Sequence, residues 1–260
     1  MNTLLQNLKT WFADYVRCFD SPDPDVQKNM DLKSLHTRRV CENILDIGRS
    51  LDLSPPDLMV SEICALLHDI GRFEQYRQYR TFVDKKSENH AALGVKIIKE
   101  NRILDGLDPT LANIIFRAVA CHNRLRVPTD GNAQFLMVLK MLRDADKLDI
   151  WRVLTEYYQS SSNNRNQAIE LDLPDNDEIS DPICEALMQG GPVQMTDLRT
   201  LNDFKLLQIG WVYDVTFPRT FQIILEKEYL EAIRKALPKE SGRVEKIYRK
   251  IRAYLEMKSG

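Results

Sequence analysis

The stretch Leu66-Leu67-His68-Asp69-Ile70-Gly71-Arg72 places an imidazole and a carboxylate side by side at the end of an apolar, helix-like run. Both groups are good ligands for a divalent metal, and neither is usual on the buried face of a helix without a partner. Gly71 follows directly and predicts that a helix ends at this pair. The chemistry of the chain therefore depends on which other residues can meet His68 and Asp69.

Outside this stretch, apolar residues recur at helical spacing along nearly the whole chain, whereas alternating strand-like runs are scarce. This pattern predicts an all-α protein. Helices are expected over about 2–20, 31–50, 56–69, 88–100, 109–123, 133–158, 181–189, 197–213, 217–236 and 240–257. The stretch 72–86, rich in arginine and aromatic residues, lies between two of them.

The composition is that of a folded chain without a strong charge bias. Apolar residues make up 43% and charged residues 28%, a composition that argues against disorder. The formal net charge of −2 gives no signal for a nucleic-acid partner. Five cysteines without a CxxC motif indicate reduced thiols in a cytoplasmic protein. The N-terminus lacks the pattern of a secretion signal, and no apolar run reaches the roughly 18 residues of a membrane span, so no membrane partner is expected.

The chain has four histidines, and each lies on a predicted helix or at its end: His36, His68, His90 and His122. An acidic cluster at 144–149 follows them on the next long helix. One candidate ligand on each successive helix is what a metal site inside a helical bundle requires. For any single histidine an ordinary core or surface role remains the alternative, and His90 could instead bond nearby backbone at a helix start.

Within the acidic cluster, the helical period selects one carboxylate. At about 100° per residue, Asp146 shares a face with Leu139 and Leu142, whereas Asp144 lies roughly opposite. We therefore expect Asp146 to be the buried carboxylate, which needs a cation or several donors. Asp149, one turn later, could be a further ligand or could orient a neighbour.

Three motifs in order make the pattern specific: His36-Thr37-Arg38-Arg39-Val40, His68-Asp69-Ile70-Gly71-Arg72 and Ala145-Asp146-Lys147-Leu148-Asp149. Together they resemble the HD superfamily of metal-dependent phosphohydrolases. The resemblance implies an all-helical fold in which His36, His68, Asp69 and Asp146 bind one divalent metal. It covers an HD core over about 30–155, with a C-terminal helical extension over about 160–260, and we interpret 1–260 as a single domain. The polar tract 160–165 and the acidic stretch 171–182 are interpreted as an excursion of that domain.

The other two histidines resemble a branch of the superfamily that holds a second metal. In that branch two further histidines complete the second site, and the aspartate of the central motif bridges both ions. His90 and His122 fit those positions, and Asp69 would be the bridge. The branch that hydrolyses cyclic dinucleotides has paired histidines and a Gly-Tyr-Pro signature, which this chain lacks, so that substrate is rejected.

The resemblance implies hydrolysis of a phosphate ester or anhydride in a nucleotide or similar small phosphorylated molecule. Mixed imidazole and carboxylate ligands suit Fe, Mn, Co, Ni or Zn, in one or two ions per chain, and such an ion activates water for attack. Asp69 and Lys147 are the catalytic candidates, because related nucleotide hydrolases use a lysine at the matching position. Lys147, Arg72, Arg77 and Arg124 are candidates for binding the phosphate, with a solvated surface role as the alternative for each arginine.

Two other functions stay open at this stage. Some HD-type proteins with six protein ligands are di-iron oxygenases, and the six ligands predicted here would serve that chemistry equally. A non-catalytic sensor or interaction protein could also keep the metal for stability. The amphipathic helices over 217–257 could serve a partner or a homodimer.

Overall fold

The computed structural model describes residues 2–159, 167–171 and 173–260, and every regular element in these ranges is helical. The predicted all-α class is therefore confirmed. Contacts divide the chain into two compact units, Met1–Asp146 and Lys147–Gly260. The expectation of a single domain stays a prediction.

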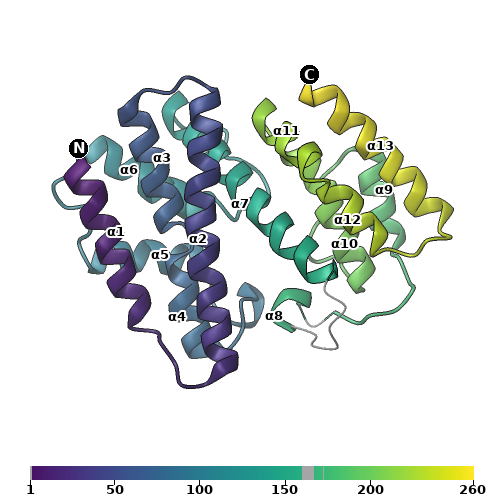
Figure 1. Ribbon diagram of the computed structural model, residues 1–260, viewed down its shortest axis with the longest axis horizontal. Coiled ribbons are helices and arrows are strands. Elements are labelled where there is room, and N and C mark those ends of the chain that lie inside the picture. The colour runs from purple at the N-terminus through teal and green to yellow at the C-terminus, as the bar shows by residue number, and fades with distance from the viewer. Residues whose placement is uncertain (1, 160–166, 172) are drawn as a thin grey trace. The chain divides into compact units, whose positions relative to one another are not determined.

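The first unit is a bundle of helices around the predicted ligands. α2 packs along α3, α4 along α5, and α6 contacts both α3 and α5 (Figure 1). Its elements are α1 (Asn2–Arg17), α2 (Pro24–Ser50), α3 (Pro55–Leu67), α4 (Ile70–Tyr79), η1 (Asp84–Lys86), α5 (His90–Glu100), α6 (Pro109–Cys121) and the first part of α7 (Ala133–Gln159).

The second unit begins within α7 and is also helical. α13 packs on α11 and α9, and α10 contacts α12 and α9. Its other elements are α8 (Gln167–Glu170), α9 (Asp181–Gln189), α10 (Leu201–Gly210), η2 (Trp211–Asp214), α11 (Pro218–Glu226), α12 (Tyr229–Lys235) and α13 (Gly242–Ser259). The helix expected over 217–236 is two helices, because Glu228 adopts a left-handed backbone with φ of 51° between them. The polar tract 160–165 lies outside the described residues.

Three helices of the first unit begin with the same local signal. α2, α3 and α6 each have proline near the first position, after Asp23, Ser54 or Asp108, whose side chain accepts hydrogen bonds from main-chain N–H groups. This signal places the start of α2 at Pro24, earlier than the predicted residue 31. Lys33 and His36 therefore lie in the interior of this helix and not near its first turn.

Gly71 does not end a helix, which corrects the sequence prediction. It is the second residue of α4, a helix that extends into the stretch 72–86 between two predicted helices. A Cβ atom at this position would lie 2.2 Å from the carbonyl oxygen of His90 and 2.7 Å from the amide nitrogen of Gly94. Glycine is therefore required here so that α4 and α5 can approach each other closely.

Helix α7 is buried around most of its circumference over residues 138–149, which corrects the prediction for Asp144. That carboxylate is fully buried instead of facing outward, and Asp146 retains 19% of its side-chain exposure. A face argument assumes that one side of the helix meets solvent. It cannot rank two carboxylates on a helix that is enclosed from several directions.

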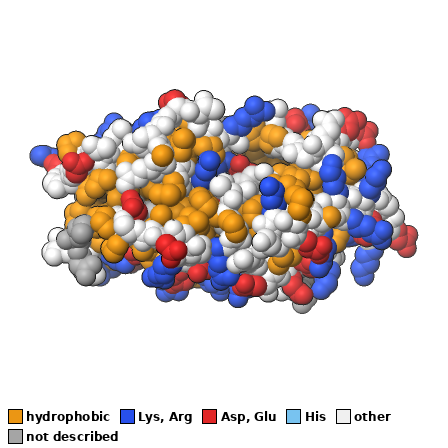
Figure 2. All heavy atoms as spheres, turned by 90° about the horizontal axis from the view of Figure 1, so that it is seen from above, with side chains coloured by type: hydrophobic (Ala, Val, Ile, Leu, Met, Phe, Trp, Pro, Cys, Tyr) orange, Lys and Arg blue, Asp and Glu red, His pale blue; other side chains and the backbone are white. Residues whose placement is uncertain are grey.

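The charged side chains of the surface are mixed in sign, as the small net charge of the sequence predicts. On the face drawn in Figure 2, basic and acidic side chains are interspersed with hydrophobic ones, and the described residues there show no large area of one sign. All five cysteines are free thiols, and only Cys18 is exposed. Within the described ranges, no helix is both long enough and apolar enough to cross a membrane.

Candidate metal centre

Helices α2 to α7 of the first unit bring the six predicted ligands together. His36 lies on α2, and His68 and Asp69 join α3 to α4. The remaining three lie at the start of α5, directly after α6 and on α7: His90, His122 and Asp146. The separate helices thus deliver side chains that are far apart in sequence to one buried point.

The first half-site consists of His36, His68, Asp146 and the Oδ2 atom of Asp69. The Nε2 atom of His36 lies 3.3 Å from Nε2 of His68, 3.1 Å from Oδ1 of Asp146 and 3.6 Å from Oδ2 of Asp69. The Nε2 atom of His68 lies 3.8 Å from each of the same two carboxylate oxygens. Four side chains therefore point their donor atoms at one small volume.

The second half-site consists of His90, His122 and the Oδ1 atom of Asp69. The two Nε2 atoms lie 3.1 Å apart, and they lie 3.4 and 3.8 Å from Oδ1 of Asp69, respectively. Asp69 thus directs one oxygen at each half-site. The donor atoms of His36, His68 and Asp69, and those of Asp69, His90 and His122, lie within 4.8 Å of one another in each set.

The hydrogen bonds of the imidazole rings decide which ring nitrogen faces the centre. Nδ1 of His68 donates to the carbonyl oxygen of Ala65, and Nδ1 of His122 donates to that of Val119, both at 2.7 Å. A carbonyl oxygen can only accept, so in the neutral ring the lone pair is on Nε2. Both rings therefore offer Nε2 to the centre.

His90 is held in the same tautomer by a carboxylate. Its Nδ1 donates to Asp84, at 2.8 Å from Oδ2 and 2.9 Å from Oδ1. Burial lowers the pKa of His90 to about 3 and that of His68 to about 4, so both rings are neutral at neutral pH. Neutral imidazole is the form that binds a metal.

The carboxylates of the centre are held in the ionised form. Burial raises the pKa of Asp69, but Lys33 and the neighbouring His68 outweigh it and hold that pKa well below its usual range. Burial opposes ionisation of Asp146 as well, and the hydrogen bond from His36 holds its pKa low. The centre therefore presents two anionic carboxylates to the neutral imidazoles of His68 and His90.

The second half-site shows most clearly that the centre fits a cation. The lone pairs of His90 and His122 both point at the space beside Oδ1 of Asp69, and no hydrogen lies between the two nitrogens when both rings are neutral. Lone pairs that converge in this way repel one another unless a positive ion lies between them. The donor set, imidazole nitrogen with carboxylate oxygen, fits a divalent transition metal.

Two residues of this centre were missed by the sequence interpretation. The Nζ atom of Lys33 lies 2.8 Å from Oδ2 of Asp69 and 5.2 Å from the ring centre of Phe82. Lys33 is one helical turn before His36, so the (i, i+3) spacing could have revealed it. Asp84 belongs to a short 3-10 helix, and nothing in its sequence neighbourhood points to His90.

Of the predicted phosphate-binding residues, Arg72 contacts the described ligands. Its Nε lies 3.5 Å from Oδ1 of Asp69, and its Nη1 donates to the carbonyl of Phe82 and to Asp84. Arg77 instead pairs with Glu74 at the surface.

The other two candidates are Arg124 and Lys147. The side chain of Arg124 is exposed, and the Nζ atom of Lys147 lies 2.6 Å from Asp214. Their roles in binding substrate stay predictions.

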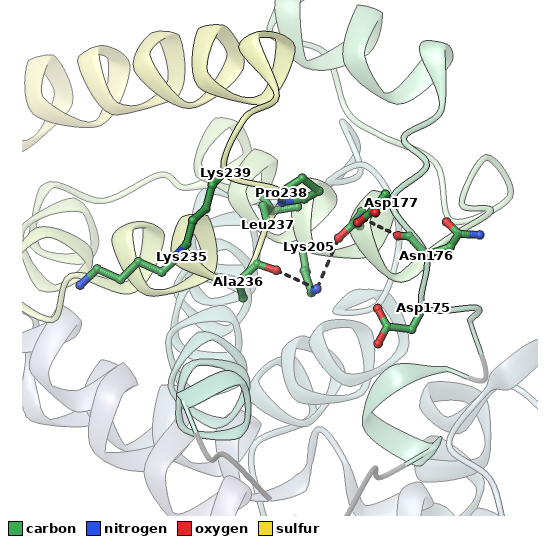
Figure 3. A pocket seen from close by; sticks show the side chains of 10 residues that line it. Asp175, Asn176, Asp177, Lys205, Lys235, Ala236, Leu237, Pro238 and Lys239 are labelled. Carbon is green, nitrogen blue, oxygen red and sulfur yellow. Dashed lines mark hydrogen bonds between the residues drawn. The ribbon is translucent and has the colours of Figure 1, made fainter. Parts of the chain in front are cut away.

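The second unit has a separate polar pocket of about 300 Å³, lined by segments 175–177 and 235–239 with Asn202 and Lys205 (Figure 3). The buried Lys205 donates to the carbonyl oxygen of Ala236 at 2.9 Å and to Asn202 at 3.4 Å. Lys235 extends away from Lys205 in this view (Figure 3). None of the predicted site residues lines this pocket.

A family model for the HD domain matches residues 34–151, which contain all six predicted ligands. No curated protein and no solved structure shows a significant match to the chain. The family match, the helical fold and the buried histidine and aspartate cluster agree with one another. Residues 34–151 thus match the HD domain family, and the buried donor atoms lie where that match leads one to expect a metal site.

Proposed function

We propose that this protein is a metal-dependent phosphohydrolase that cleaves a phosphate ester or anhydride of a nucleotide or a similar small molecule. The observation that supports it is the position of Asp69, whose two oxygens each face a separate pair of histidine Nε2 atoms. The first half-site would hold one divalent ion and the second half-site another, with Asp69 between them. Fe, Mn, Co, Ni and Zn all suit these ligands.

When bound, such ions supply Lewis-acid stabilisation of phosphoryl oxygens and lower the pKa of water toward 7, so that it can attack at neutral pH. The ligands differ in how far their side chains are buried, and this difference indicates where substrate can reach them. The side chains of His68 and His122 are at most 2% exposed, whereas that of Asp146 is 19% exposed. The substrate would therefore approach the centre from the side of Asp146, where solvent already reaches the ligands.

Lys33 and Arg72 would have different roles: Arg72 would hold the carboxylate of Asp69, and Lys33 would bind the phosphoryl group of the substrate. Arg72 is fixed by the carbonyl of Phe82 and by Asp84, so it holds Asp69 in place. Lys33 is a flexible side chain whose described ion pair is with Oδ2 of Asp69. A divalent ion on that oxygen would weaken this pair, and a phosphoryl group would then be the nearest anion for the ammonium group.

The test combines metal content with hydrolysis. Protein purified under anaerobic conditions is analysed for metal per chain and then assayed on a panel of nucleotides and phosphate monoesters with Mn²⁺ or Co²⁺. Lys33→Ala should retain the metal and raise KM or lower kcat by at least tenfold. Lys96→Ala, an exposed lysine on α5, is the matched control and should behave as wild type. Wild-type protein without metal or without turnover would contradict the proposal.

The second candidate is a di-iron oxygenase, because the same six ligands are assembled around two histidine pairs. Two irons per chain, oxygen consumption and no hydrolysis of any phosphate would favour it. A metal without any turnover would favour the non-catalytic sensor. We further propose that the protein is cytoplasmic and that its main partner is its small phosphorylated substrate. We also propose that it forms a homodimer through residues 217–257, which a measurement of its mass in solution tests.

A further inference from the structure

We propose that Asp84 is the positioning residue of the second half-site, and that its carboxylate holds His90 in the orientation that makes it a metal ligand. The inference rests on the part of the proposed function in which the cluster holds metal. Nδ1 of His90 lies within 2.9 Å of both oxygens of Asp84, so the ring can neither rotate nor change tautomer without losing this bond.

The need for a carboxylate follows from where His90 lies on its helix. His68 and His122 follow the last turns of α3 and α6, and each donates Nδ1–H to the carbonyl three residues earlier. His90 is the first residue of α5, so no helical turn precedes it to offer such a carbonyl. A side chain outside α5 accepts the hydrogen bond from Nδ1–H instead, and Asp84 is that side chain.

Asp84 is itself held by two side chains of α4. Its Oδ1 accepts hydrogen bonds at 2.9 Å from Nη1 of Arg72 and from Nε2 of Gln75, both on α4. Gln75 is fully buried and also donates to Ser87 and to the carbonyl of Glu88, so it fixes the loop that carries Asp84. The orientation of His90 is thereby tied to α4, which begins directly after Asp69.

Loss of the carboxylate would act mainly on the second half-site. The ring of His90 would keep a buried N–H without a strong acceptor, and Nε2 would no longer be directed at Oδ1 of Asp69. Removing such a partner of a metal-binding histidine typically weakens metal binding by about 10–100-fold. Asp84 has no described contact with His36, His68 or Asp146, and Arg72 keeps the carbonyl of Phe82 as an acceptor, so the first half-site should lose less affinity than the second.

The experiment measures Co²⁺ binding alone, by titration calorimetry and by the visible absorption of the bound ion, on the full chain. Wild type should bind two ions. Asp84→Ala should weaken the second ion by about 10–100-fold, and Asp84→Asn, which keeps an acceptor without the charge, should weaken it less. Ser87→Ala removes another contact of Gln75 in the same loop and should leave both affinities unchanged.

The outcomes separate this inference from the proposed function. Two ions bound by Asp84→Ala with wild-type affinity would overturn the role of Asp84 and leave the hydrolase standing. Equal losses at both half-sites, or an equal loss in Ser87→Ala, would also overturn it, because they would indicate general damage to the loop. Wild-type protein that binds no ion would overturn the proposed function itself. Circular dichroism melting confirms that each variant is folded.

Discussion

The His36–His68 pair and the His90–His122 pair are built to a common plan. In each pair the two residues are 32 positions apart, and the second directly follows a helix of 13 residues with proline near its start. In each, that second histidine donates Nδ1–H to the carbonyl three residues earlier. The same local device thus orients one ring of each half-site.

The two half-sites differ in what surrounds these rings. The first has a second carboxylate, Asp146, among its donors and Lys33 on its oxygen of Asp69. The second has no further described carboxylate at the donor atoms, and Asp84 instead lies behind His90. More anionic donors should give the first half-site the higher affinity, whereas fewer donors leave the second with more positions for water or substrate.

Asp69 is the one residue whose loss should abolish the difference between the half-sites. Asp69→Ala should remove both ions and all detectable activity, because it takes an oxygen from each set of donors. Elemental analysis after dialysis against metal-free buffer measures this loss. Asp105→Ala, at an exposed aspartate, is the control. A variant that retained either ion at wild-type affinity would show that Asp69 is not shared.

Single histidine variants should then separate the two half-sites. His36→Ala should remove the tighter ion and His90→Ala the weaker one, so each variant should retain about one ion per chain in place of two. Calorimetric titration with Mn²⁺ identifies which affinity is lost. If both variants lost the same ion, the division into half-sites would be wrong.

Gly71→Ala should disturb the second half-site more than the first. The added Cβ would meet the backbone of His90 and Gly94, and relief of such an overlap costs about 3 kcal/mol of unfolding free energy. Chemical denaturation measures this loss, and titration shows whether the weaker ion suffers more. Gly242→Ala has open space around its Cβ and should change stability little.

The pH dependence of the metal-free protein should reflect one buried ring in each half-site. The pKa values of His68 and His90 lie near 4 and 3 in the folded chain, against 6.5 in an exposed histidine. Below pH 6.5 the unfolded chain binds the extra protons, so stability should fall by about 2 kcal/mol per ring between pH 7 and pH 5. Chemical denaturation at pH 7 and pH 5 measures this loss of stability, and the loss should be about half as large in His68→Gln or His90→Gln as in wild type. An unchanged loss would show that these rings are not the cause.

The sequence by itself determined the helical class, most helix positions and the six candidate ligands. Helices follow from a period of 3.6 residues and from caps such as Asp108 and Ser54, which are local properties of the chain. His36, His68 and Asp69 were recognisable because their spacing and flanking residues repeat a known order. In the structure the donor atoms of these three residues lie within 4.8 Å of one another.

Only the tertiary structure decided which polar groups support those ligands. Asp84 meets His90 through a 3-10 helix that no periodicity predicts, and Gly71 serves a contact between two helices instead of ending one. Asp144 is buried because α7 is enclosed from several sides, which a single-helix argument cannot detect. Local patterns set which face of a helix can be apolar, whereas the neighbours of a buried polar group depend on how distant segments pack, and that is decided by the whole fold.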